Sequence, residues 1–350
     1  MKQRRAECAG LAVVFGYSKL RGFHPNVSDC SRLGHFHAAR HTFPLTGSPA
    51  RLLRDVARDG LIEVAKLFRE SLYGDEIFQG FTAEETIFEG RTPYQNVQIF
   101  ETRRWGKVLV LDGIVQTTDK DEFIYHEMLT HVPMFACANP RTAMIVGGGD
   151  GGILREVLKH DIERVDMVEI DRTVVDICIA QMPAHNDAGG IYRDPRANLV
   201  IEDAFEFVKR EKRRYDVIMV DSTDPVGAGE VLFSRTFYEL CKNSLNPGGV
   251  LALQDGVIFL QPHEARGSMA GLRELGLKAR CYLIAVPTYY GGNMTLGLAS
   301  DDVAALTRDV DSLRRRYEAS GVQTKHYTPE LHAASFVLPK WMEEITGGLA

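Results

Sequence analysis

Five carboxylates occupy positions from which a nucleotide-binding fold would bring them together. One of them, Asp150, lies inside the glycine run 147–152. The other four follow short apolar runs that predict strands, and these are Glu169, Asp203, Asp221 and Asp224. Because ligands bind at the carboxyl ends of strands in open α/β sheets, we expect the five to converge on one crevice. Carboxylates crowded there would repel one another unless the ligands were cationic.

The glycine run has the surroundings of a nucleoside-binding turn. Residues 142–146 predict a strand before it and residues 153–159 a helix after it, and Glu169 lies 22 positions beyond the first glycine. This pattern alone suggests NAD. However, the pyrophosphate of a dinucleotide would rest against the turn, where the Asp150 carboxylate would repel it. We therefore expect a nucleoside with a positively charged tail, such as a sulfonium.

The order of the predicted elements indicates an α/β protein. A small antiparallel β domain with a linking helix is expected over residues 67–135. A doubly wound Rossmann-like domain, of the class I methyltransferase type, is expected over residues 136–345. The individual elements expected are strands at 81–89, 97–101, 108–111 and 250–253, a helix at 119–136, a closing hairpin from 281–286 and 294–299, and terminal helices at 301–317 and 339–345.

Residues 1–66 differ from the rest of the chain in character. The first sixty positions hold ten Lys or Arg against four Asp or Glu, without a repeat or a sustained periodicity before Arg51. A helix is conceivable over residues 51–68. The segment reads as a basic, poorly ordered leader, and three explanations stay open: a targeting peptide, a disordered tail, or a reading frame that begins upstream of the true start.

Composition narrows the class of protein. The chain has 350 residues, 45% of them apolar and 25% charged, with a net charge of −6, so nothing points to a nucleic-acid partner. Its six cysteines show no CxxC spacing, which favours reduced thiols in a cytoplasmic protein over disulfides or a zinc site. Apolar runs stay short of the roughly 20 residues that a membrane span needs, so no membrane partner is expected.

The chain resembles the spermidine synthases, or polyamine aminopropyltransferases. Its sequence at 123–128 is closer to that of bacterial members. The resemblance covers roughly residues 67 to 342. The segments that carry it, in the order of the family, are 110–118, 121–128, 147–156, 168–171, 221–225, 246–249 and 287–292.

The resemblance implies an enzyme of polyamine biosynthesis. It would transfer the aminopropyl group of decarboxylated S-adenosylmethionine to putrescine, giving spermidine and 5′-methylthioadenosine. The nucleoside is then a co-substrate, and neither a cofactor nor a metal is expected because the sulfonium is already an activated leaving group. A cytoplasmic homodimer or homotetramer is expected.

The resemblance also implies a role for each site residue. Asp221 would accept the proton of the attacking amine. His126 would have to be neutral to help bind a cation. The donor-binding set would be Gln95, Asp150, Glu169, Asp203, Ala204 and Ala228, and the substrate-binding set would be Tyr125, His126, Asp150, Asp221, Asp224 and Tyr289, with Gln116 a further plausible nucleoside contact.

Within these sets, Glu169 would take the ribose hydroxyls, Asp203 the adenine amino group and Asp150 the ammonium of the tail. Two positions depart from the family pattern. Ala228 stands where many members have proline, and Ala204 stands where glycine is usual.

Three rival functions and one structural alternative remain open at this point. The chain could be a putrescine N-methyltransferase, a nucleoside-binding regulator without activity, or an aminopropyltransferase for another amine such as cadaverine, agmatine or spermidine. Any single acid at a strand end could also serve only as a helix N-cap or a turn former.

Overall fold

The computed structural model describes residues 66–348 except 75, 223–226 and 291. Contacts divide the chain into two units, Met1–Glu63 and Val64–Ala350, and all the structure described below belongs to the second. The expected leader therefore lies almost wholly outside the described residues. The helix considered for 51–68 is wrong at its C-terminal end, because Lys66–Glu70 forms strand β1.

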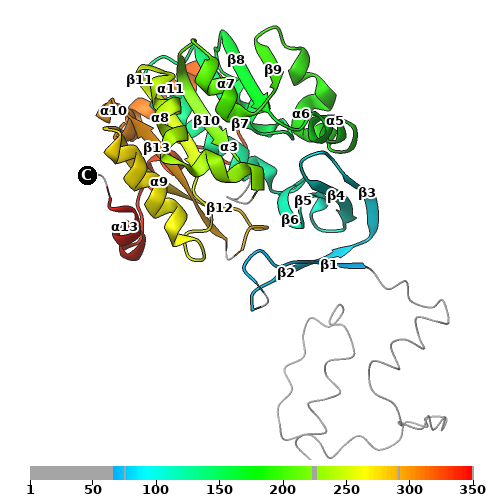
Figure 1. The fold of residues 1–350 in the computed structure, drawn as a ribbon. Helices are drawn as coiled ribbons and strands as arrows, with labels where there is room; N and C mark the ends of the chain where they lie inside the picture. Colours follow the sequence, from blue (N-terminus) through cyan, green and yellow to red (C-terminus); the bar gives the residue numbers. More distant parts are fainter. Residues whose placement is uncertain (1–65, 75, 223–226, 291, 349–350) are drawn as a thin grey trace, which may run out of the picture. The chain divides into compact units, whose positions relative to one another are not determined.

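Two antiparallel sheets form the small N-terminal domain (Figure 1). Strand β1 pairs with β2 (Gln79–Ala83). The strands β3 (Glu85–Arg91), β4 (Asn96–Thr102), β5 (Gly106–Leu111) and β6 (Ile114–Thr118) follow one another in a four-stranded meander. The expected strand at 81–89 is divided at Glu84, and β1 and β6 were not predicted. Both β5 and β6 are short and are joined by a tight turn in which Asp112 and Gly113 have positive φ.

A seven-stranded sheet forms the core of the larger domain, and its order is β12-β13-β11-β10-β7-β8-β9. Neighbouring strands pair in parallel from β9 to β11, whereas β13 runs antiparallel to both of its neighbours. This confirms the doubly wound α/β fold and its closing hairpin. The strands are β7 (Thr142–Gly147), β8 (Arg164–Glu169), β9 (Ala197–Ile201), β10 (Tyr215–Asp221), β11 (Leu245–Gln254), β12 (Lys278–Ala285) and β13 (Asn293–Ser300).

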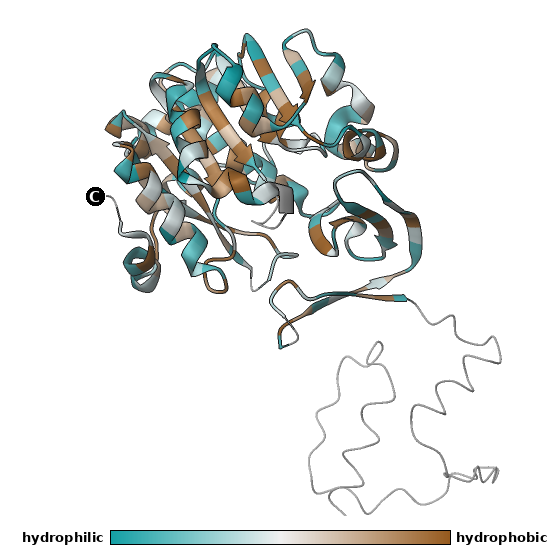
Figure 2. Cartoon of the chain, viewed as in Figure 1, coloured by the Kyte–Doolittle hydropathy of each residue, from teal (hydrophilic) through white to brown (hydrophobic). Residues whose placement is uncertain are grey.

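Helices cover both faces of this sheet, and the central strands are apolar on both sides (Figures 1 and 2). Along β7, Ala143 and Ile145 face one hydrophobic cluster while Met144 and Val146 face the other. This alternation is expected for a strand buried on two faces. The helices are α3 (Glu122–Ala136), α4 (Gly152–Val157), α5 (Arg172–Gln181), α6 (Pro183–Asn186), α7 (Ala204–Arg210), α8 (Arg235–Asn243), α9 (Pro262–Glu274), α10 (Val303–Leu306), α11 (Val310–Ser320), α12 (Pro329–Ser335) and α13 (Lys340–Thr346).

Two predicted helices have different limits in the structure. The linking helix begins at Glu122 and not at 119, because the Asp121 carboxylate binds Thr118 and Thr288 instead of continuing a helical turn. The helix expected at 301–317 is two helices, interrupted between α10 and α11. Three short 3₁₀ segments, Asp187–Gly189, Ile191–Arg193 and Gly227–Phe233, complete the description.

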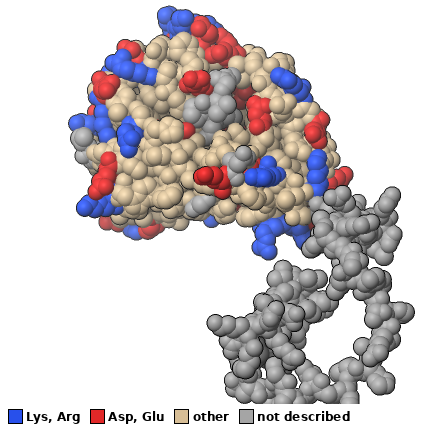
Figure 3. All heavy atoms as spheres, turned by 60° about the horizontal axis from the view of Figure 1, so that its bottom comes forward, with Lys and Arg blue, Asp and Glu red and all other residues tan. Residues whose placement is uncertain are grey.

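The four cysteines in the described residues, Cys137, Cys178, Cys241 and Cys281, are free and buried. Within residues 66–348, as far as they are described, no helix is long and apolar enough to cross a membrane. Acidic and basic side chains are interspersed on the face shown in Figure 3.

One buried carboxylate ties helix α3 to the C-terminal part of the chain. Glu127 is 1% exposed. Its two oxygens accept hydrogen bonds from the backbone N–H groups of Lys325 at 2.7 Å, His326 at 2.7 Å and Tyr327 at 2.8 Å. These three donors precede α12 and lie in no helix or strand, so the carboxylate provides the partners that secondary structure does not.

We expect Glu127→Gln to lower the free energy of unfolding by about 1–3 kcal/mol, because the new amide NH₂ would face backbone N–H donors that then lose their acceptor. Urea unfolding measures this. Glu318→Gln on the exposed side of α11 is the control, and its effect should stay within about 0.5 kcal/mol. Equal stability of the two variants would show that the C-terminal segment does not depend on this carboxylate.

Candidate active site

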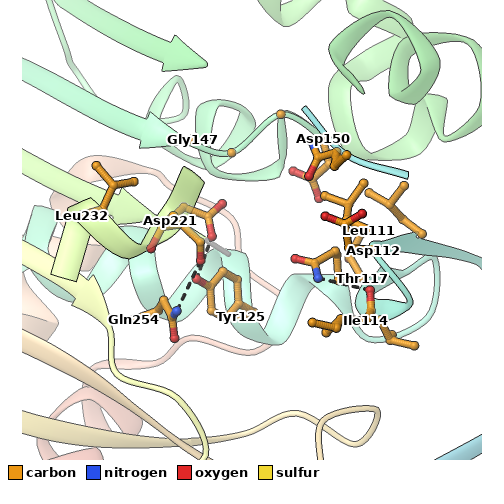
Figure 4. A pocket seen from close by; sticks show the side chains of 18 of the residues that line it. Leu111, Asp112, Ile114, Thr117, Tyr125, Gly147, Asp150, Asp221, Leu232 and Gln254 are labelled. Carbon is orange, nitrogen blue, oxygen red and sulfur yellow. Dashed lines mark hydrogen bonds between the residues drawn. The ribbon is translucent and has the colours of Figure 1, made fainter. Parts of the chain in front are cut away.

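A pocket opens at the carboxyl ends of the parallel strands, where the strand order reverses between β7 and β10 (Figure 4). The pairing register puts Asp221, the last residue of β10, opposite Gly147, the last residue of β7. Asp221 therefore lies beside the glycine turn because of the sheet itself. Of the predicted site residues, those that line this one pocket are Gln95, Gln116, Tyr125, His126, Asp150, Glu169, Asp203, Ala204, Asp221 and Tyr289.

Close packing requires glycine at two positions of the turn. Gly147 has φ +81°, and a Cβ there would lie 2.1 Å from the carbonyl oxygen of Asp221. At Gly152 a Cβ would lie 2.2 Å from the imidazole of His126. The turn is thus pressed against β10 on one side and against helix α3 on the other, which brings Asp221 and His126 to the pocket.

Asp150 is held by donors from three parts of the chain. Its Oδ1 accepts the backbone N–H of Gly152 at 2.9 Å. Its Oδ2 lies 3.1 Å from Nε2 of His126 and 3.2 Å from Nδ1 of His185. Burial acts to raise the pKa of this carboxyl, but the two imidazoles outweigh it and hold the pKa well below its usual range. Asp150 is therefore ionised at neutral pH.

His126 lies between two carboxylates. Besides Asp150, its Nδ1 lies 2.6 Å from Oε2 of Glu122, which also accepts from Arg155 at 2.8 Å. Burial acts to lower the pKa of His126, but Asp150 and Glu122 together raise it to about 10. The expectation of a neutral His126 is wrong for this structure. The fold brings two carboxylates, Glu122 and Asp150, to its ring, and both favour the charged imidazole.

Asp221 faces the pocket, and within the described part of the chain the hydroxyl of Tyr125 donates to it at 2.7 Å (Figure 4). Burial, with the charge of Asp150 as a second cause, raises the pKa of Asp221 to about 6. His126 and Tyr125 act in the opposite direction. A carboxylate with this pKa is still ionised at neutral pH but is a stronger proton acceptor than a solvated aspartate.

Glu169 ends β8 at the pocket, next to the glycine turn. Its Oε1 accepts the backbone N–H of Asp171 at 2.8 Å. A Cβ at Gly149 would lie 3.1 Å from its Oε2, so a larger residue there would press against this carboxylate. Burial raises the pKa of Glu169 to about 7. Hydrogen-bond donors from a ligand would favour its ionised form.

Asp203 caps a helix, as the structural alternative for the strand-end acids predicts, and it also lines the pocket. Its Oδ1 caps helix α7 by accepting the N–H groups of Phe205 at 2.8 Å and Glu206 at 3.3 Å. The carboxylate is exposed, and Ala204 beside it is buried. The cap and the pocket position are therefore compatible, because the cap uses one oxygen of two.

The small domain contributes to the pocket through Gln95. Its Nε2 donates to Oδ2 of Asp171 at 3.2 Å, and the Thr92 hydroxyl donates to the same oxygen at 2.5 Å. Asp171 also caps helix α5 through Thr173. Asp171 belongs to a segment that carries the resemblance, but its part in joining the two domains was not foreseen.

The other end of the pocket is lined by aromatic and amide side chains. Tyr289 donates its hydroxyl to the backbone oxygen of Gln116 at 2.6 Å. Glu70 is 2% exposed and accepts from Nε2 of Gln79 at 2.5 Å. The lining residues at this end that sequence reasoning missed are Glu70, Tyr73, Gln79, Gln254, Gln261 and Tyr290. Their spacing carries no signal, because they come from β1, β2, β11 and three loops.

Sequence reasoning also missed His185. The side chains of two predicted residues, Asp224 and Ala228, lie outside the described part of the structure. A histidine just after helix α5 has no distinctive spacing, and only the fold brings it to Asp150. Asp224 lies outside the described residues. Ala228 falls in the 3₁₀ segment Gly227–Phe233, and its side chain is not described, whereas Gly229, Val231 and Leu232 of that segment line the pocket.

Comparisons with known proteins assign most of the described unit to one family. The family described as "Spermine/spermidine synthase domain" matches residues 122–309, and the one described as "Spermidine synthase tetramerisation domain" matches residues 68–119. Polyamine aminopropyltransferase 1 of Pseudomonas aeruginosa is 46% identical over 280 residues, which is 79% of this chain and 97% of that protein. The polyamine aminopropyltransferase of Pectobacterium atrosepticum is 46% identical over 265 residues, 75% of this chain and 92% of that protein.

Solved structures agree with the sequences. A spermidine synthase in complex with the transition-state analogue AdoDATO is 34% identical, with a TM-score of 0.76 over 81% of this chain and 95% of that one. The spermidine synthase of Thermotoga maritima is 32% identical, with a TM-score of 0.74 over the same shares. Sequence, fold and the two matched segments lead to one conclusion: the chain belongs to the spermine/spermidine synthase family.

Proposed function

We propose that this protein transfers the aminopropyl group of decarboxylated S-adenosylmethionine to putrescine, giving spermidine and 5′-methylthioadenosine. One observation carries the proposal. A single pocket has acids suited to a nucleoside at one end, Asp221 with a raised pKa in its middle, and an aromatic stretch with the buried Glu70 at the other end. Acids at both ends of an aromatic passage suit a diamine whose second ammonium needs its own carboxylate.

The nucleoside end suits the donor. Glu169 offers two acceptor oxygens for the ribose hydroxyls, and the exposed Asp203 can accept from the adenine amino group. Asp150 then faces the ammonium of the aminopropyl tail. These three assignments are supported by the fact that Glu169, Asp203 and Asp150 line the same pocket.

The chemical step follows from the position of Asp221. The amine lone pair attacks the propyl carbon next to sulfur, the C–S bond breaks, and its electron pair stays on sulfur as the neutral thioether. The proton of the amine passes to Asp221. With an amine pKa near 10.4, the free base costs roughly 4.6 kcal/mol at neutral pH. The raised pKa of Asp221, about 6, narrows the gap between acceptor and donor of this proton. The sulfonium is the leaving group, so the step as proposed draws on no separate cofactor.

We also propose an oligomeric state and a cellular compartment for this protein. The match to a tetramerisation domain and the exposed apolar side chains of Leu67 and Phe78 favour a homodimer or homotetramer, which light scattering would test. The free, buried cysteines favour the cytoplasm.

The decisive test is to incubate the purified protein with either nucleoside donor and a panel of amines, and to identify products by mass. The donors are decarboxylated S-adenosylmethionine and S-adenosylmethionine. The amines are putrescine, cadaverine, agmatine and spermidine. Spermidine and 5′-methylthioadenosine are the expected products. Methylated putrescine would support the N-methyltransferase instead, and donor binding without any product would support a regulator.

Asp221→Asn should keep donor binding and lose about 10²–10⁴-fold in kcat, because the amide keeps the shape of the site but cannot accept the proton. Steady-state kinetics and donor titration measure the two effects. Asp176→Asn on the surface of α5, where the side chain is 54% exposed, is the control and should behave as wild type. A kcat within about tenfold of wild type, equal to roughly 1.4 kcal/mol of barrier, would exclude Asp221 as the base.

Tyr125→Phe should move the acidic limb of the kcat/KM profile to higher pH. The profile should steepen below about pH 6, because Asp221 as well as the amine must then lose a proton. The Tyr125 hydroxyl lowers the pKa of Asp221, so its loss raises that pKa and the steep part begins at higher pH. Tyr289→Phe, which removes a hydroxyl bonded to Gln116, should leave this break in place. A break that does not move in Tyr125→Phe would contradict the assignment of the limb to Asp221.

A further inference from the structure

Charged groups of alternating sign form a row of ion pairs that passes through the glycine turn at Asp150 and includes His185. The proposed function uses Asp150 but gives His185 no task. Neighbours in this row approach to between 2.5 and 3.5 Å, and their order is Asp119, His185, Asp150, His126, Glu122, Arg155, Glu156 and Lys159. With all eight groups ionised, negative and positive charges balance.

Asp150 has capacity for one more donor. An ionised carboxylate offers about four acceptor positions, and Gly152, His126 and His185 use three of them. The pocket borders Asp150, so an ammonium can reach the remaining position. No group of three or more His, Cys, Asp or Glu in the described residues is arranged to hold a metal ion. A ligand ammonium is thus the cation that the site can receive.

His185 holds its proton less tightly than His126. Its ring lies 3.2 Å from Asp150 and 3.5 Å from Asp119, whereas His126 lies 2.6 Å from Glu122 and 3.1 Å from Asp150. Nε2 of His185 is buried, and its contact with Oδ1 of Asp119 is long at 3.5 Å, so Asp119 acts on it mainly through its charge. The carboxylate on that side, Asp119, has a side chain 33% exposed, so water can reach it.

An arriving ammonium would place three cations around one buried carboxylate. On the basis of the proposed function, we propose that His185 gives up a proton when the aminopropyl ammonium of the donor binds Asp150. The Nε2–H bond of His185 breaks, its electron pair stays on Nε2, and the proton leaves to water beside Asp119. Nδ1 of His185 keeps its proton and continues to donate to Asp150, so His185 still positions that carboxylate for the tail of the donor.

The groups around His185 define this equilibrium. Asp119 faces it from the segment after β6, Asp150 from the glycine turn, and His126 from α3 with its ring centroid 6.0 Å away. From α4, Arg155 donates to the backbone oxygen of His185 at 3.2 Å. Burial acts to lower the pKa of His185, and the two aspartates raise it, whereas the positive His126 opposes them. Lys107 acts on Asp119 from β5. A further cation at Asp150 adds to the effect of His126 and favours the neutral imidazole.

The consequence is a donor affinity that depends on pH. The complex holds fewer protons than the free protein, so affinity for the cationic donor rises with pH, by up to about tenfold per unit. The pKa values of Glu169 and Asp221 lie at about 7 and about 6, so the charge of a nucleoside sulfonium would also act on their protonation. The comparison must therefore use a ligand with the sulfonium but without the ammonium.

Isothermal titration calorimetry in buffers of different ionisation enthalpy tests this, because it counts protons released on binding. The ligands are decarboxylated S-adenosylmethionine and the dimethylsulfonium analogue of adenosine, which lacks the aminopropyl tail. Near neutral pH the donor should release up to about one proton more than the analogue. In His185→Gln this excess should vanish while the donor still binds. His263→Gln, an exposed histidine of α9, is the matched control and should keep the excess.

Asp119→Asn provides a second variant that leaves the histidine in place. Loss of the Asp119 charge lowers the pKa of His185, so the rise of donor affinity should move to lower pH. Equal proton release by the two ligands, or an excess that persists in His185→Gln, would overturn this inference alone. An unchanged pH profile in Asp119→Asn would do the same. Failure of the donor to bind wild-type protein would overturn the proposed function and this inference with it.

Discussion

Burial of several carboxylates at one edge of a parallel sheet is the constraint on which the rest of this structure depends. A carboxylate away from water is costly unless cations or N–H donors surround it. Asp150 meets this requirement with a backbone N–H of helix α4 and two imidazoles, and His126 is backed in turn by Glu122. The glycines of the turn make these contacts possible, because a side chain at Gly152 would occupy the space of the His126 ring.

The same constraint gives identical residue types different properties. Asp150 accepts from a backbone N–H and two imidazoles, and its pKa falls well below the usual range. The pKa of Asp221, which accepts from the hydroxyl of Tyr125, is raised by burial to about 6. Glu169 is compensated by backbone donors only in part, and its pKa rises to about 7. One pocket therefore contains a fixed anion and two carboxylates able to change protonation when a ligand binds. Titratable groups whose surroundings separate their pKa values in this way are typical of sites for general acid–base chemistry.

The small β domain is part of the site, not an appendage to it. Gln95 and Thr92 bind Asp171 at the start of α5, and Gln116 receives the hydroxyl of Tyr289. Asp119, at the end of the same domain, faces His185. The aromatic end of the pocket takes Glu70 and Gln79 from β1 and β2. A Rossmann-like domain alone would hold Asp150, Glu169 and Asp203 but would lack this end of the pocket.

The amino-acid sequence by itself determined the strands of the large sheet, the glycine turn, and the acids at the strand ends. These are local properties, since apolar alternation and turn chemistry are read within a few residues. It did not reveal β1, the break between α10 and α11, or the C-terminal partners of Glu127. Only the tertiary structure brought Asp150 to His185, 35 positions along the chain, and Glu70 to the pocket. Only the tertiary structure also made His126 a cation, because protonation depends on burial and on the distance to other charges, and neither is encoded in a local pattern.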